Sequence, residues 1–145
     1  MNVIVDTNIV FSVIANTSSK LANTFFSIPV QAEYYAPDFL ITELQLHKRK
    51  LLQLSGLTEA EYEISKTSVF AQINFVDTAS LPEAYLKEAA YLTKDIDNKD
   101  FEFVALALFL DTLFWTGDKV LYRGLRRKKF MNVLTTSELI STFGL

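Results

Sequence analysis

The sequence is poor in several residue types, and each shortage excludes a class of protein or site. Cysteine is absent, which excludes disulfide bonds and thiolate metal sites. The four glycines form no phosphate-binding loop, and the single histidine, His47, belongs to no Ser-His-Asp arrangement. The longest apolar run, residues 101–110, contains Glu102 and is far shorter than the roughly 20 residues that cross a membrane. The start of the chain does not resemble a signal peptide, so we expect a cytoplasmic protein without membrane contact.

Apolar side chains, in contrast, are abundant. Half of the 145 residues are hydrophobic, and phenylalanine alone occurs twelve times. This amount of apolar surface is sufficient for a dense core without disulfide or metal support. No repeat, low-complexity segment or Gly-, Ser- or Pro-rich linker divides the chain, so we expect one domain spanning residues 1–145.

Apolar runs that suit buried strands alternate along the chain with segments that suit helices. The run at residues 2–5 has no polar alternation, which is typical of a buried parallel strand. Thr58 precedes Glu61 by three residues, which is a capping-box pattern, and Thr136 or Ser137 is the expected cap of the last helix. The pattern predicts an α/β fold, a three-layer α/β/α sandwich around a central, mostly parallel sheet. Strands are expected at residues 2–5, 33–36, 73–76, 112–116 and 131–134, and helices at residues 7–15, 18–26, from 37 onward, 58–69, 82–91, 97–110 and 136–143.

Acidic residues stand where the predicted strands and helices meet. Asp6 ends the first strand, and Asp118 follows the strand at residues 112–116. Asp97 and Asp100 lie three residues apart at the start of a predicted helix, which places them on one face of it. In parallel α/β sheets, ligands bind beyond the carboxyl ends of the strands. We therefore expect these acids to converge at one edge of the sheet.

Converging carboxylates suggest a bound cation. Without one, their mutual repulsion raises their pKa values and lowers the stability of the fold. Mg²⁺ and Mn²⁺ prefer oxygen ligands and retain several waters. One or two such ions would activate a water and hold a scissile phosphate, so the acids indicate metal-dependent cleavage of phosphodiester bonds.

Each acid also has a purely structural interpretation. Asp6 suits the N-cap of the helix that follows it. Asp97 and Asp100 suit the positive end of a helix dipole, and Gly117-Asp118 suits an ordinary turn. For any one residue the structural interpretation is the stronger, whereas the joint placement at one sheet edge favours a site.

Several segments of the chain resemble PIN-domain proteins in their order and spacing. The most specific is the pair Asp97-x-x-Asp100 with its apolar helix, followed by Trp-Thr-Gly-Asp at residues 115–118. PIN domains are compact α/β/α nucleases, typically Mg²⁺- or Mn²⁺-dependent ribonucleases, and many bacterial ones are the toxins of toxin–antitoxin pairs. The matching segments are residues 5–8 (Val-Asp-Thr-Asn), 42–44 (Thr-Glu-Leu), 97–108, 115–119 and 133–139, which together extend over essentially the whole chain.

The resemblance implies a role for each matching residue. Glu43 is included on the resemblance, because its spacing alone does not place it, and Glu102 is an alternative acid near the site. The implied catalytic and metal-binding acids are Asp6, Glu43, Asp100 and Asp118, with Asp97 as a further metal ligand, and the implied supporting residues are Asn8 and Thr116.

Basic residues are clustered, although the net charge of −3 by itself argues against a nucleic-acid-binding protein. The cluster at residues 123–129 closely follows Asp118 and would hold RNA phosphates, with a solvated loop as the alternative. Tyr122 and Phe130 border this cluster and are candidates for base stacking, although core packing is the simpler interpretation. His47 is interpreted as a surface residue. The candidate RNA-binding residues are Arg123, Arg126, Arg127 and Lys128.

Together these features predict an endoribonuclease that uses Mg²⁺ or Mn²⁺ to cleave RNA and acts as a toxin with a partner antitoxin protein. An interaction module with the same fold and an idle site is the alternative. A phosphoaspartate receiver is disfavoured, because it needs adjacent acids where this chain has Asp6-Thr7-Asn8. The first two predicted helices are unusually apolar, which suits a homodimer or partner surface, although core burial is the simpler interpretation.

Overall fold

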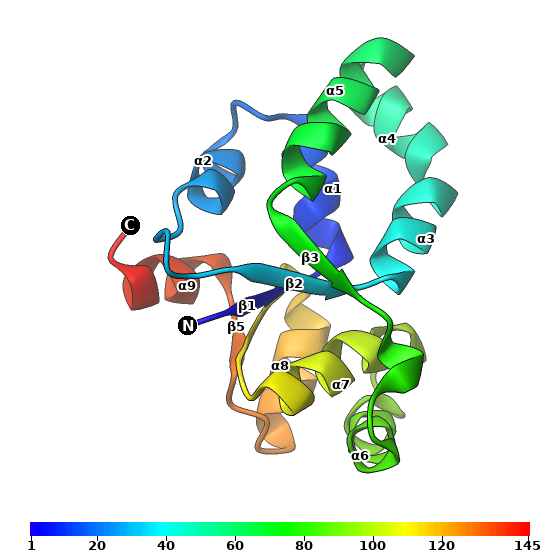
Figure 1. The fold of residues 1–145 in the computed structure, drawn as a ribbon, viewed down its shortest axis with the longest axis vertical. Coiled ribbons are helices and arrows are strands. Elements are labelled where there is room, and N and C mark those ends of the chain that lie inside the picture. The colour runs from blue at the N-terminus through cyan, green and yellow to red at the C-terminus, as the bar shows by residue number, and fades with distance from the viewer.

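Five short parallel strands form the centre of the computed structural model, which describes residues 1–145 (Figure 1). All five predicted strands are confirmed, with ends that differ by no more than two residues. Val3, Ile4 and Val5 are fully buried, as expected for a strand covered on both faces. The strands are β1 (Val3–Val5), β2 (Tyr34–Pro37), β3 (Ile73–Val76), β4 (Leu113–Trp115) and β5 (Val133–Leu134), in the order β3-β2-β1-β4-β5.

Helices cover both faces of the sheet, so the predicted three-layer α/β/α sandwich is confirmed (Figure 1). On one face lie α1 (Thr7–Ala15), α2 (Lys20–Phe26), α3 (Phe39–Leu46), α4 (Lys48–Ser55) and α5 (Glu59–Phe70). On the other face lie α6 (Glu83–Thr93), α7 (Phe101–Leu110) and α8 (Lys119–Arg127), with the short 3-10 helices η1 (Thr78–Ser80) and η2 (Asn98–Asp100) preceding α6 and α7. The last helix, α9 (Thr136–Phe143), follows β5.

Two helices, α4 and α8, were not predicted, and several predicted helix ends were displaced by one or two residues. Residues 48–55 were assigned to no element, and the basic cluster at residues 123–129, which overlaps the end of α8, was interpreted as an RNA contact or a solvated loop. The last helix is capped by Thr135 rather than by Thr136 or Ser137, because Thr135 forms a capping box with Glu138. The predicted helix at residues 97–110 is divided into η2 and α7. The capping box of Thr58 and Glu61 at the start of α5 is confirmed.

The hydrophobic core is one cluster of 33 buried residues between the layers. Trp115 is fully buried in it, as predicted, and its indole N–H donates a hydrogen bond to the Thr136 hydroxyl at 3.0 Å. Phe130 is buried as well. The helices α1 to α9 include none that is both long and apolar enough for a membrane span.

The strand order places a crevice beside β1. From β1 the chain continues through β2 and β3 on one side, and it later adds β4 and β5 on the other. Ligand sites in parallel α/β sheets form beyond the carboxyl ends of strands at such a reversal. Val5 pairs with Trp115, so the residues that follow β1 and β4 emerge next to each other at that edge.

Candidate active site

Asp6 lies directly after β1 and is held from two sides. Its Oδ1 accepts a hydrogen bond from the Thr7 backbone N–H at 2.8 Å, and its Oδ2 accepts one from the Thr116 hydroxyl at 2.6 Å. The residue is only 4% exposed. It also occupies the N-cap of α1, so the structural interpretation of this aspartate holds alongside any functional one.

Two threonines link Asp6 to further acids. The Thr7 hydroxyl donates to Glu43 Oε1 at 2.6 Å, which fixes a residue of α3 against the start of α1. The Thr116 hydroxyl donates to Asp6 while it accepts the Asp118 backbone N–H at 3.0 Å. Through Thr7 and Thr116, Asp6 is thereby linked to the Glu43 carboxylate and to the backbone of Asp118.

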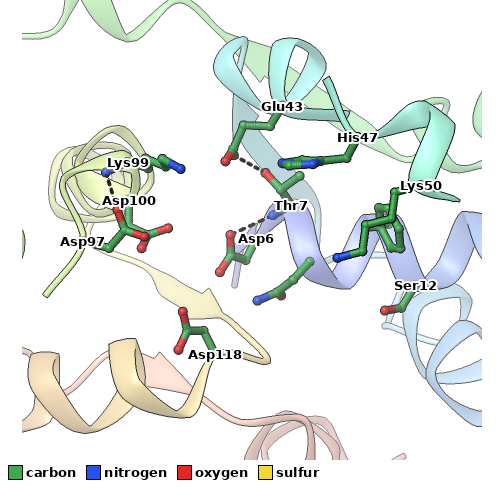
Figure 2. A pocket seen from close by; sticks show the side chains of 12 residues that line it. Asp6, Thr7, Ser12, Glu43, His47, Lys50, Asp97, Lys99, Asp100 and Asp118 are labelled. Atoms are coloured by element: carbon green, nitrogen blue, oxygen red, sulfur yellow. Dashed lines mark hydrogen bonds between the residues drawn. The ribbon is translucent and has the colours of Figure 1, made fainter. Parts of the chain in front are cut away.

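Asp118 turns the chain from β4 into α8. Its Oδ1 caps the helix by accepting the backbone N–H groups of Val120 and Leu121 at 2.9 and 3.1 Å. Asn8 holds the same turn from α1, because its Oδ1 accepts the Gly117 N–H at 3.2 Å. One carboxylate oxygen of Asp118 is thus used by the helix, and the other has no hydrogen-bond partner and points towards the other acids (Figure 2).

Asp97 and Asp100 come from the opposite side, on the segment between α6 and α7 (Figure 2). Asp97 caps η2 by accepting the Lys99 N–H at 2.9 Å. The Asp100 side chain makes neither a hydrogen bond nor an ion pair, although it is only partly exposed. Of all the acids in this region, Asp100 is the one whose charge is least balanced by the protein.

The segment that carries these two acids is attached to α8. Ile96 packs over Gly124, where an added Cβ would lie 2.5 Å from Ile96 Cδ1 and 2.8 Å from Cγ1. Lys128, directly after the same helix, donates to the carbonyls of Tyr91 and Leu92 at 3.0 and 3.2 Å, and it pairs with the Asp95 carboxylate. The helix that begins at one acid therefore sets the position of the segment that carries two others.

The proximity of the acids changes their proton affinity. Burial raises the pKa of Asp6 to about 7, against the lowering effect of the Thr116 and Thr7 hydrogen bonds. Burial, with the charges of Asp6, Asp97, Asp118 and Glu43, raises the pKa of Asp100 to about 8. Burial also raises the pKa of Glu43, while the Thr7 hydrogen bond lowers it. Such shifts are typical of carboxylates gathered without a compensating cation.

One pocket collects these side chains (Figure 2). Only one of its 12 lining residues is hydrophobic, so its surface suits a charged or strongly polar ligand rather than an apolar one. No group of three or more histidine and carboxylate side chains is arranged as a ready-made metal site. The lining residues are Asp6, Thr7, Asn8, Phe11, Ser12, Glu43, His47, Lys50, Asp97, Lys99, Asp100 and Asp118.

The model of the PIN domain family matches residues 4–138 of the sequence. The chain belongs to the PIN-domain family. No curated protein sequence matches the chain. Its fold is similar to a solved structure described as VapBC2 from Rickettsia felis bound to a DNA fragment from their promoter. That alignment covers 93% of this chain and 97% of the other, with a TM-score of 0.64 and 17% identity, and at this identity the likeness concerns the fold alone.

PIN domains are generally nucleases and typically depend on divalent metal ions. The pocket of this PIN domain contains all five acids that the sequence resemblance selected, together with Asn8. Thr116 is buried, does not line the pocket, and donates a hydrogen bond to Asp6. Glu102, the alternative acid, lies outside the pocket and accepts a hydrogen bond from Thr78. The assignment of catalytic and ligand roles to these residues stays a prediction.

The four basic residues chosen as RNA contacts lie on or directly after α8, outside the acid-lined pocket. Arg126 pairs with Glu138 at 3.0 Å and donates to the Val133 carbonyl at 3.2 Å, and Lys128 is engaged as described above. Arg123 and Arg127 are exposed. Their role in RNA binding stays a prediction, but the structure does not place them at the acids.

Several pocket residues were missed by sequence reasoning. Thr7 follows Asp6 directly, so this adjacency could have identified its hydroxyl as part of the site. Ser12, Lys50 and Lys99 gave no signal, because their orientation depends on how α1, α4 and η2 pack. His47 was interpreted as a surface residue; it is exposed and also lies at the edge of the pocket.

Proposed function

We propose that this protein is an endoribonuclease that hydrolyses RNA phosphodiester bonds with Mg²⁺ or Mn²⁺. One observation carries the proposal: carboxylates from the ends of two adjacent strands and from the segment between α6 and α7 lie in one polar pocket. We call this segment, residues 94–100, the η2 segment. The neighbouring strand ends supply Asp6 and Asp118, and η2 supplies Asp100. Membership of a family of nucleases supports the same reaction class.

The donor set suits a hard divalent cation. All five acids offer oxygen atoms, which Mg²⁺ and Mn²⁺ prefer, and the Asp100 carboxylate has no other partner. Asp6, Asp100 and Asp118 would hold the ion, with Glu43 and Asp97 as further carboxylates, after the side chains rotate towards one another. When bound, the ion would supply Lewis acidity and a water of lowered pKa.

The remaining polar residues would orient the acids. Thr116 and the Thr7 backbone fix the plane of the Asp6 carboxylate, so its oxygens present a constant geometry. Asn8 keeps the turn at Gly117 in place and therefore positions Asp118. A site with its ligands already oriented loses little free energy to reorganisation when substrate binds.

The test is cleavage of RNA by purified protein. Single-stranded and structured RNA are incubated with Mn²⁺, with Mg²⁺ or with EDTA, with a known nuclease as the positive control. We expect cleavage by the wild-type protein with either metal, none with EDTA, and none by the Asp6→Asn variant. Intact RNA in the metal-containing samples would contradict the proposal and favour a PIN-like module with an idle site.

We further propose that the nuclease is the toxin of a toxin–antitoxin pair. The support is the similarity in fold to a VapBC toxin–antitoxin complex. Expression of the wild-type chain in bacteria should stop growth, the Asp6→Asn variant should not, and a small protein encoded beside the gene should restore growth. Normal growth with the active enzyme would contradict the toxin role and leave the nuclease activity in place.

A further inference from the structure

The cations of the chain differ in what they contact. Arg126 and Lys128 of the basic cluster are occupied by Glu138, Asp95 and backbone carbonyls. Lys50 and Lys99 line the acid pocket, and neither makes an ion pair or a side-chain hydrogen bond. The ammonium groups that remain free to bind a ligand at the acids are therefore these two lysines.

At the start of α4, the side chains of Lys48, Arg49 and Lys50 have three different surroundings. Lys48 pairs with Glu59 at 2.9 Å and lies over the Tyr62 ring, so it serves the contact between α4 and α5. Arg49 is exposed on the outer surface, beside Leu52. Lys50 alone lines the acid pocket. Three adjacent side chains of the same charge thus have different surroundings, and only one of them faces the acids.

The two lysines stand at opposite ends of the acidic centre (Figure 2). Lys50 lies near Ser12 of α1 on one side of Asp6, and Lys99 lies on the other side, where its side chain extends towards Glu43. Both side chains point inward over the pocket (Figure 2). A ligand that spans the pocket meets an ammonium group at each end and carboxylates between them.

This order of charges fits a chain of phosphates. In an RNA chain, a phosphate held at the carboxylates through a metal ion has a neighbouring phosphate on either side. Lysine binds phosphate as a mobile point charge. The scarcity of apolar residues in the lining excludes a pocket for a hydrophobic small molecule. We propose that Lys50 and Lys99 hold the phosphates on either side of the scissile one in single-stranded RNA. The proposal rests on the ribonuclease function proposed above.

The test measures RNA binding without cleavage. A short fluorescein-labelled single-stranded RNA is titrated with the Asp6→Asn variant in Mg²⁺, and anisotropy gives the Kd at several salt concentrations. Adding Lys50→Ala or Lys99→Ala should weaken binding about tenfold and reduce the salt-dependence slope by about 1. Lys50→Arg and Lys99→Arg should retain most of the affinity, because they keep the charge. Thermal unfolding of each variant checks that the fold is intact.

Arg49→Ala is the matched control. It removes the same charge from an exposed residue of α4 that is adjacent to Lys50 but lies outside the acid pocket, and it should change Kd less than about twofold. Equal losses for Arg49→Ala and the two lysine variants would overturn the proposal, and so would unchanged binding by the lysine variants. In the otherwise wild-type enzyme, the lysine variants should raise KM more than they lower kcat. A protein that neither binds nor cleaves RNA would overturn the ribonuclease function itself.

Discussion

Asp6 and Asp100 line the same pocket, but they differ in their hydrogen bonds and in how their segments are attached to the fold. Asp6 accepts two hydrogen bonds, caps α1 and follows the central strand, so it belongs to the rigid framework of the sheet. Asp100 accepts none and belongs to a segment attached to the rest of the fold through Ile96 and Lys128. Burial raises the pKa of both, but only for Asp100 do the charges of neighbouring carboxylates add to burial without an opposing hydrogen bond.

The two carboxylates therefore differ in whether the protein orients the side chain and in whether it balances the negative charge. On the framework side, which consists of Asp6 and Asp118 after β1 and β4, hydroxyl and N–H groups orient the carboxylates before any ligand arrives. On the η2 side, the protein supplies position through α8 and leaves the charge to be balanced by a cation. A site divided in this way is expected to be most sensitive to loss of an acid, less to displacement of the η2 segment, and least to loss of one orienting hydroxyl.

Replacement of either acid should have the largest effect. Asp6→Asn and Asp100→Asn should each lower the rate of RNA cleavage on the order of 10²–10³-fold, the scale of removing one electrostatic group from a transition state. The two variants should differ in metal-free stability at pH 8. Asp100→Asn should raise Tm more than Asp6→Asn, because it removes an unpaired charge and loses no hydrogen bond. Equal Tm changes would contradict the comparison.

The stability of the metal-free protein should fall as pH rises. The folded protein retains protons on Asp6 up to a pKa of about 7 and on Asp100 up to about 8, whereas the unfolded chain releases them near pH 4. The folded state therefore binds more protons between about pH 4 and 8, and the free energy of unfolding decreases across that range. Denaturant unfolding in EDTA, compared with Asp100→Asn, measures the contribution of that residue.

Metal should reverse this loss. Mn²⁺ at pH 8 should raise the Tm of the wild-type protein, because it binds the folded state alone. The increase should be much smaller for Asp100→Asn. A wild-type Tm that does not respond to Mn²⁺ would mean that the η2 acids are balanced in another way.

Gly124→Ala should displace the η2 segment without touching an acid. The new Cβ would overlap the Ile96 side chain, so that side chain, or the segment that carries it, must shift, at a cost of about 1–3 kcal/mol in the free energy of unfolding. Cleavage should fall about tenfold, since small displacements of reacting groups are costly. The double variant Gly124→Ala with Ile96→Ala restores space and should recover part of the activity. No recovery would place the defect elsewhere.

Thr116→Val should have the smallest effect. It keeps the side-chain volume but removes the hydroxyl that donates to Asp6 and accepts from Asp118. The free energy of unfolding should fall by about 1–2 kcal/mol, and cleavage should fall several-fold with the metal affinity. Denaturant unfolding and Mn²⁺ titration measure the two effects. A loss as large as that of Asp6→Asn would show that Thr116 acts directly in the reaction.

The framework side could be predicted from the sequence, and much of the η2 side could not. Asp6 and Asp118 follow apolar runs, and the rule for parallel sheets places such residues at one edge. The attachment of the η2 segment could not be predicted, because the basic cluster at residues 123–129 was interpreted as an RNA contact or a solvated loop. The helical character of α8 depends on the Asp118 cap, a local feature that also suits an ordinary turn, and on burial of Leu121 and Leu125, which is a tertiary effect.

The cations illustrate the same limit. The sequence shows two basic clusters but not the contacts of each side chain. Arg126 is occupied because β5 and α9 pack beside α8, and Lys50 faces the acids because the chain breaks at His47 between α3 and α4. Both outcomes depend on the directions in which successive helices pack, which the order of charges in the sequence does not show.

We propose that the framework acids, Asp6 and Asp118, and the acids of the η2 segment, Asp97 and Asp100, bind one or two divalent metal ions between them. Anomalous diffraction from crystals soaked in Mn²⁺ tests it most directly. We expect a manganese peak within about 2.0–2.3 Å of carboxylate oxygens from Asp6 or Asp118 on one side and from Asp97 or Asp100 on the other. Its absence at saturating Mn²⁺, or a peak only at acids outside the pocket, would contradict the claim.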